Sequence, residues 1–114
     1  MLKKVKECAD EIPQETRLII AALDSPIRQA ILVLLNKNEE LSFSELQQQF
    51  SVGKLTLNFH LKKLFSNALI DHYYKHEVGN QKFSFYSITP LGSRILASLN
   101  NALTPPPPTT AKGT

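Results

Sequence analysis

Apolar positions recur at helical spacing near the start of the chain. Over residues 26–35 they fall at i, i+3, i+4, i+7 and i+8, which is the spacing of one buried helical face. Ser25 is a favourable N-cap and Pro26 suits the first helical position, so we expect a helix that begins here and ends at 36–38. A shorter helix is expected over 15–23, after a proline that interrupts the lysine-rich opening.

A complete helix-start signature comes next. Ser42 and Glu45 have the spacing of a capping box, and Leu41 and Leu46 have the spacing of a hydrophobic staple. These residues predict a short helix that ends at about Phe50.

The following stretch predicts a helix-turn-helix. Residues 51–53 form a tight connection that contains a glycine, and 54–67 has the pattern of a longer helix. The inner face of this longer helix is expected to consist of Leu57, Leu61, Leu64 and Ala68.

Strand-forming residues dominate the segment after that helix. Residues 69–77 and 82–88 are rich in Tyr, Phe and Ile and flank a short turn, so they predict a β-hairpin. Thr89 and Pro90 then cap and start a last helix, which ends before the proline run at 105–108.

This order of elements predicts one domain that is mostly α with a small β-hairpin. It is the order of a winged helix-turn-helix with flanking N- and C-terminal helices. With 114 residues and 42% hydrophobic content, the chain can build one core. We expect a basic N-terminal segment over 1–14, the winged domain over 15–103 and a proline-rich disordered tail over 104–114.

Charge is distributed unevenly along the chain. Residues 10–53 carry seven acidic and three basic side chains, whereas 54–82 carries five lysines and two acidic residues. A polyanion would be attracted to the second segment and repelled by the first. The excess of lysine therefore coincides with the longer helix and the hairpin.

Several stretches resemble the ArsR-like transcription regulators. Residues 23–32 resemble the opening of that family, 41–46 its positioning helix, 56–70 its recognition helix and exit, and 86–92 its strand-to-helix junction. The resemblance covers almost the whole folded part. It implies a homodimer that regulates transcription by binding double-stranded DNA. The run Phe-His-Leu-Lys-Lys-Leu at 59–64 resembles members that lack a metal site.

Three positions depart from the family pattern. Ala68 stands where the family has a glycine that ends the helix, so either Asn67 takes the left-handed conformation or the helix exits differently. Phe59 occupies a position often filled by Arg or Tyr. Gly79 and Asn80 replace a Gly-Arg pair at the wing tip, which removes one expected DNA contact.

The outer half of the longer helix is the expected DNA-reading surface, because a recognition helix lies in the major groove. Asn58 can bond an adenine edge, Thr56 a base or a phosphate, and the lysines are expected on phosphates. The full expected DNA-binding set is Ser42, Lys54, Leu55, Thr56, Asn58, Phe59, His60, Lys62, Lys63, Lys75, Asn80, Gln81 and Lys82.

Other interpretations of these residues stay open at this point. Leu55 and Phe59 either cover thymine methyl groups or pack on the hairpin or on a protein partner. His60 either reaches a phosphate or bridges helices. The alternative function is a winged helix that binds protein within a transcription or assembly complex, which the absence of Arg from helix and wing favours.

The first and last helices carry more apolar surface than the small core can cover, which predicts dimerisation through both. The expected dimer interface consists of Leu18, Ile19, Ala22, Leu23, Leu91, Ile95, Leu99 and Leu103.

Catalytic and metal-binding patterns are missing from the sequence. No nucleophile stands with a base, no carboxylates pair on a helix face, and the glycines are dispersed, so we expect neither an enzyme nor a cofactor. His72 and His76 share a strand face but lie about 13 Å apart, too far to hold one ion. We therefore expect no metal site.

Cellular location follows from apolar runs and cysteine content. The apolar runs at 18–23 and 30–35 are far shorter than the ~20 residues that span a bilayer, so we expect a soluble chain without a membrane partner. Cys8 is the single cysteine, which excludes an internal disulfide and suits the cytoplasm. The sequence does not identify an effector ligand.

Overall fold

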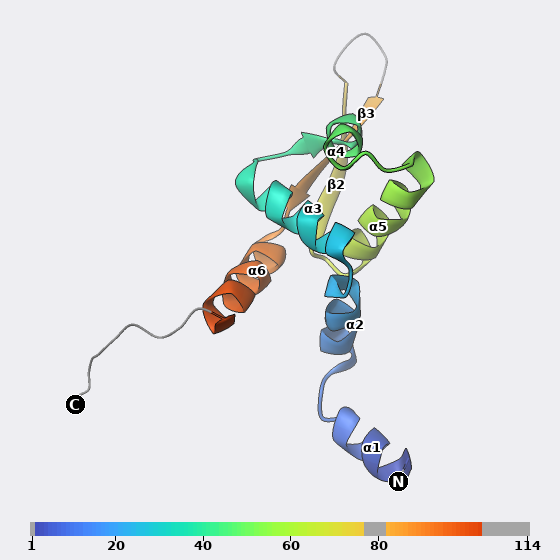
Figure 1. Ribbon diagram of the computed structural model, residues 1–114, viewed down its shortest axis with the longest axis vertical. Helices are drawn as coiled ribbons and strands as arrows, with labels where there is room; N and C mark the ends of the chain where they lie inside the picture. The colour runs from blue at the N-terminus through green and yellow to red at the C-terminus, as the bar shows by residue number, and fades with distance from the viewer. Residues whose placement is uncertain (1, 77–81, 104–114) are drawn as a thin grey trace, which may run out of the picture.

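The computed structural model describes residues 2–76 and 82–103. Within these residues the chain forms helices and one small sheet (Figure 1). The predicted wing turn at 78–81 and the predicted tail at 104–114 lie outside the described residues. The elements in chain order are α1 (Leu2–Ala9), α2 (Gln14–Leu23), α3 (Pro26–Lys37), β1 (Leu41–Ser42), α4 (Phe43–Phe50), α5 (Lys54–Ser66), β2 (Ile70–His76), β3 (Lys82–Ile88) and α6 (Pro90–Leu103).

Side-chain caps begin three of the helices where the sequence predicts them. The Ser25 side chain accepts a hydrogen bond from the Arg28 backbone N–H at 3.3 Å. The capping box before α4 is complete, because the Ser42 hydroxyl accepts from the Glu45 backbone and the Glu45 carboxylate accepts from the Ser42 backbone. The Thr89 hydroxyl accepts from the backbone N–H of Gly92 at 3.0 Å. These bonds satisfy N–H groups that have no partner inside a helix.

The predicted hairpin forms, and it gains a third strand. β2 and β3 pair antiparallel, and the two residues of β1 pair with the other edge of β3, giving the strand order β1-β3-β2. Leu41 lies opposite Tyr86, and Ser42 lies opposite Phe85. The sequence did not predict β1, because two residues are too short to show strand alternation.

The core lies where three helices meet the base of the hairpin. α3 contributes Ile31, Leu32 and Leu35, α4 contributes Leu46, and all are at most 1% exposed. The inner face predicted for α5 is confirmed for Leu57, Leu61 and Leu64, which are also at most 1% exposed. Ala68 was predicted on that face and this was wrong, because it lies beyond the end of α5 and is exposed.

The chain leaves α5 through a left-handed residue. Asn67 keeps φ −102°, and Ala68 itself takes φ 60°. The backbone N–H of Leu69 bonds to the Leu64 carbonyl, and that of Ala68 bonds to the Phe65 carbonyl. This is the Schellman arrangement, in which the left-handed position usually belongs to glycine. The left-handed conformation thus falls on Ala68 itself and not on Asn67, and the helix still ends in the Schellman arrangement.

The start of α6 packs tightly against this exit. A Cβ atom placed on Gly92 would lie 2.3 Å from the Leu69 carbonyl oxygen, so the close approach needs glycine. The Thr89 hydroxyl also donates to the Ala68 carbonyl at 2.7 Å. The exit of α5, the end of β3 and the start of α6 therefore form one rigid junction.

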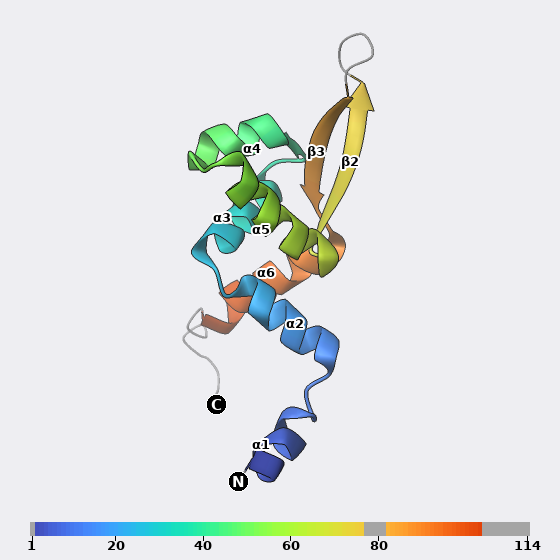
Figure 2. The same cartoon turned by 90° about the vertical axis from the view of Figure 1, so that its right-hand side faces the viewer.

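The basic N-terminal segment contains a helix, α1, which the sequence pattern does not predict. α1 has no buried residues, and it lies away from the body, at the end of the molecule opposite the hairpin (Figure 2). Within the described residues no single helix is long and apolar enough to cross a membrane. The bent pair α2 and α3, with 93° between its helices, passes that test by length and composition alone.

Candidate nucleic-acid interface

α5 presents one face to the core and the opposite face to solvent. Figure 2 shows it beside the base of the hairpin. The leucines of its inner face are buried, whereas Leu55 is 85% exposed and Phe59 is 54% exposed. Thr56 is exposed and Asn58 is half-buried. The predicted outer face thus exists as a surface, and it combines polar, apolar and basic side chains.

Three lysines line this exposed face. Lys54, Lys62 and Lys63 are all exposed, and none forms an ion pair within the described part of the chain. The Lys63 amino group lies 5.5 Å from the centre of the Phe59 ring, close enough for a cation–π contact. The face can therefore offer positive charge to an anionic partner without first breaking an ion pair.

His60 bridges helices, which is one of its two predicted roles. An NH₂ group of the Arg28 guanidinium donates to Nδ1 of His60 at 2.8 Å. The Arg28 Nε atom donates to the Ala22 carbonyl at 2.6 Å, so this arginine joins α2, α3 and α5. Burial and the Arg28 charge lower the pKa of His60 from its ordinary value. The bonded Nδ1 atom is thus held neutral and accepting.

The structure places Lys75 away from the other predicted DNA contacts. In the register of the hairpin it lies opposite Phe83, on the sheet face that α5 does not cover. Its amino group pairs with the Glu40 carboxylate, which also accepts a hydrogen bond from the Tyr73 hydroxyl. These two bonds lower the pKa of Glu40. Lys75 therefore joins the loop before β1 to the hairpin, on the face of the sheet opposite Lys82, and its contact with DNA stays a prediction.

The wing contributes one described candidate. Lys82 is exposed at the start of β3 and lies on the same face of the hairpin as His72 and Tyr86, the face that meets α5. Asn80 and Gln81 lie outside the described residues. Ser42, at the start of α4, uses its hydroxyl in the capping box.

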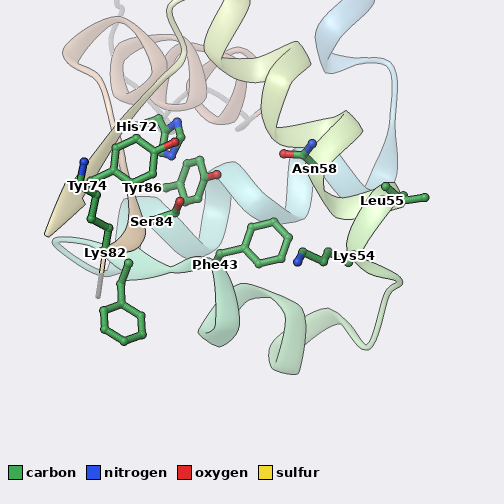
Figure 3. A pocket seen from close by; sticks show the side chains of 10 residues that line it. Phe43, Lys54, Leu55, Asn58, His72, Tyr74, Lys82, Ser84 and Tyr86 are labelled. Carbon is green, nitrogen blue, oxygen red and sulfur yellow. The ribbon is translucent and has the colours of Figure 1, made fainter. Parts of the chain in front are cut away.

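A hollow of about 360 Å³ separates α5 from the hairpin (Figure 3). Lys54 and Asn58 project into it from α5, Tyr86 lines it from β3, and Phe43 closes it from α4. Sequence reasoning missed this hollow, because no pattern along the chain brings the start of α4 beside β3.

The predicted dimer residues divide into three groups. Ala22 is 3% exposed inside its own core, which removes it from any interface. Leu18 and Leu99 are about half exposed, at 49% and 47%, and four others are half-buried against the core. The half-buried members are Ile19, Leu23, Leu91 and Ile95. The side chain of Leu103 lies outside the described residues.

The prediction missed an apolar residue beside these. Ile20 is 56% exposed and lines a groove of about 460 Å³ together with Leu23 and Leu99. The groove therefore runs between α2 and α6. The available signal was an apolar residue that falls outside the inner stripe of its helix.

Side chains that commonly bind metals do not gather in the described chain. Among residues 2–76 and 82–103 no group of three His, Cys, Asp or Glu side chains could hold an ion. Cys8 is exposed in α1.

The described elements and their order define a winged helix-turn-helix fold. No protein-family model matches the sequence, and no curated protein matches it. The fold is similar to that of solved transcription regulators.

One similar structure is the transcriptional regulator homologue from Pyrococcus horikoshii OT3, with TM-score 0.61 and 24% identity over 79% of this chain and 94% of that one. Another is the repressor BigR from Xylella fastidiosa, with TM-score 0.60 and 22% identity over 90% and 93%. A third is Bacillus subtilis PadR in complex with operator DNA, with TM-score 0.61 and 23% identity over 77% and 54%. At these identities the likeness establishes the fold.

Proposed function

We propose that this protein is a DNA-binding transcription regulator that places α5 in a major groove. The observation that carries the proposal is the two-sided character of α5. Three leucines fix its inner face in the core, while Lys54, Lys62 and Lys63 stand exposed and without ion pairs in the described chain. A rigid helix with unneutralised lysines along its open side is suited to a polyanion.

The polar residues divide between two tasks. Lysine contacts with phosphates position a helix but carry no sequence information, whereas an amide can bond the edge of an adenine in the major groove. Asn58 and Thr56 are the candidates for base contacts. Lys82 is the candidate in the wing for a contact with the DNA phosphate backbone. PadR, a protein of similar fold, has been solved in complex with operator DNA, which supports DNA as the partner of this fold.

We further infer an ArsR-like homodimer that uses the groove between α2 and α6. Ile20 and Leu99 both line this groove and leave about half of their surface exposed. A symmetric partner would cover both copies of this groove. Two recognition helices would then read half-sites about 34 Å apart, one helical turn of DNA or a multiple of it.

The rival function is a winged helix that binds protein. The observation that favours it is the exposure of Leu55 and Phe59 in the middle of the proposed DNA surface. Thymine methyl groups also provide apolar contacts in the major groove, so both functions use these residues. The lysines separate the two functions, because an apolar protein partner does not need them.

A fluorescence anisotropy titration tests the proposal. The full chain is titrated with the duplex upstream of its own gene and with a shuffled duplex, at two salt concentrations. We expect tighter binding to the first duplex, and Lys62→Ala to weaken both complexes. The matched control is Lys37→Ala, an exposed lysine at the end of α3 that should leave binding unchanged. Equal affinity for both duplexes, or no binding at low salt, would contradict the proposal.

A further inference from the structure

The hollow between α5 and the hairpin has the size and lining of a ligand pocket. Its volume is about 360 Å³, and small-molecule sites begin at about 300 Å³. Aromatic rings from three elements line it, namely Phe43 from α4, Tyr74 from β2 and Tyr86 from β3. A ligand with one six-membered ring fits this space, and aromatic walls favour a planar ring.

The charge of the pocket is positive. Lys54 reaches into it from one side with its amino group toward Phe43, and Lys82 lies on the other side beside Tyr74 (Figure 3). Among residues 2–76 and 82–103 no carboxylate lines the pocket and neither lysine has an ion pair. The ligand that complements these groups is an anion.

The floor of the pocket contains an unused hydrogen-bonding atom. The His72 ring stacks on Tyr86 with centroids 4.5 Å apart, and the centroid of the exposed Tyr74 ring lies 4.8 Å from that of His72. The His72 Nε2 atom is buried and has no hydrogen-bond partner among the described residues. Burial lowers the pKa of His72, so the ring is neutral at pH 7.

We propose that this pocket binds a small planar aromatic carboxylate, with its ring between Phe43 and Tyr86 and its carboxylate held by Lys54. Lys54 and Asn58 also belong to the proposed DNA surface, so an occupied pocket competes with DNA. The competition rests on the proposed function, whereas ligand binding itself does not.

The test is titration of the full chain with benzoate, followed by NMR chemical shifts of the backbone amides. Two matched probes separate ring from charge, because benzamide keeps the ring without the charge and cyclohexanecarboxylate keeps the charge without the planar ring. We expect saturable shifts at residues 54, 58, 74 and 86 with benzoate, and at least fivefold weaker binding of each control probe. Equal binding of all three probes, or no saturable shift, would overturn the proposal.

Two variants locate the site. Lys54→Gln removes the charge from the pocket at an exposed position and should weaken benzoate binding at least fivefold. Lys62→Gln, on the same helix but outside the pocket, should leave it unchanged. Equal benzoate binding by Lys54→Gln and the unaltered chain would contradict the assignment. If benzoate binds in this way while no duplex binds, the ligand site stands and the DNA-binding proposal fails.

Discussion

Arg28 donates a hydrogen bond to His60 across 32 positions of the sequence, and this contact fixes α5 against α3. The same guanidinium donates to the carbonyls of Ala22 and Ala21 at the end of α2. One side chain therefore connects the helix proposed to read DNA with a helix proposed to hold the dimer.

Replacing this arginine should destabilise the whole domain. Arg28→Ala leaves the buried Ala22 carbonyl without its charged donor, which costs about 1.5–3 kcal/mol, whereas the half-buried Nδ1 atom of His60 can bond water instead. We expect the free energy of unfolding, measured by urea denaturation, to fall by about 2–3 kcal/mol. Arg94→Ala, at an exposed position of α6, should change it by less than about 0.5 kcal/mol. Equal effects of the two substitutions would show that the Arg28 contacts contribute no stability.

Stability should also depend on the protonation of His60. Its pKa in the folded chain is below the ordinary value of 6.5, because of burial and the Arg28 charge. Above pH 6.5 both the folded and the unfolded chain hold a neutral ring, so this residue adds no pH dependence. As the pH falls from 6.5 toward the folded-state pKa, the unfolded chain takes up the proton first, and the free energy of unfolding falls.

His60→Gln isolates this effect. The glutamine oxygen can still accept from Arg28 but does not titrate. Between pH 7 and pH 5 the variant should lose less stability than the unaltered chain. His72, whose pKa burial also lowers, contributes equally to both proteins. Parallel stability curves for the two proteins would exclude His60 as the source of the pH dependence.

The left-handed alanine predicts a stabilising substitution. An L-residue pays about 1–2 kcal/mol in this conformation, and glycine does not, although glycine costs about 0.5–1 kcal/mol in unfolded-chain entropy. Ala68→Gly should therefore raise the free energy of unfolding by about 0.5–1 kcal/mol. Ala97→Gly, in the interior of α6, should lower it by about 1 kcal/mol. Effects of the same sign at both positions would contradict the Schellman assignment.

How far the sequence predicts the fold depends on how local the cause is. Ser25, Ser42 and Thr89 cap helices through bonds that reach three residues ahead, so the sequence shows them directly. β1 and the role of Arg28 depend on partners far along the chain. Such contacts leave no pattern in a short window.

The candidate site divides in the same way. Helical periodicity correctly separated the inner and outer faces of α5. It could not show that Lys75 pairs with Glu40, 35 residues earlier, or that Ala22 packs inside its own core. The burial of Ala22 follows from how α2 crosses α3, which is a tertiary property.

The groove between α2 and α6 predicts how a dimer can be broken. Ile20→Glu places a charge in an apolar interface, where an unpaired carboxylate is costly. Sedimentation velocity should show the unaltered chain as a dimer at micromolar concentration and this variant as a monomer. Leu55→Glu changes an even more exposed apolar residue on α5 and should remain dimeric. A monomeric unaltered chain would exclude this interface at that concentration.

The most direct test of the DNA-binding proposal compares Asn58→Ala with Lys62→Ala on one operator and on single-base variants of it. Asn58→Ala should cost about 1–3 kcal/mol on the operator and abolish discrimination at one base pair in each half-site. Lys62→Ala should weaken binding to every sequence alike and reduce the slope of log K against log salt by about 0.9 for each phosphate that the lysine neutralises. Two distinct signatures are the predicted result. Unchanged affinity in both variants, with Leu55 and Phe59 essential for holding a protein partner, would contradict DNA binding and support the protein-binding function.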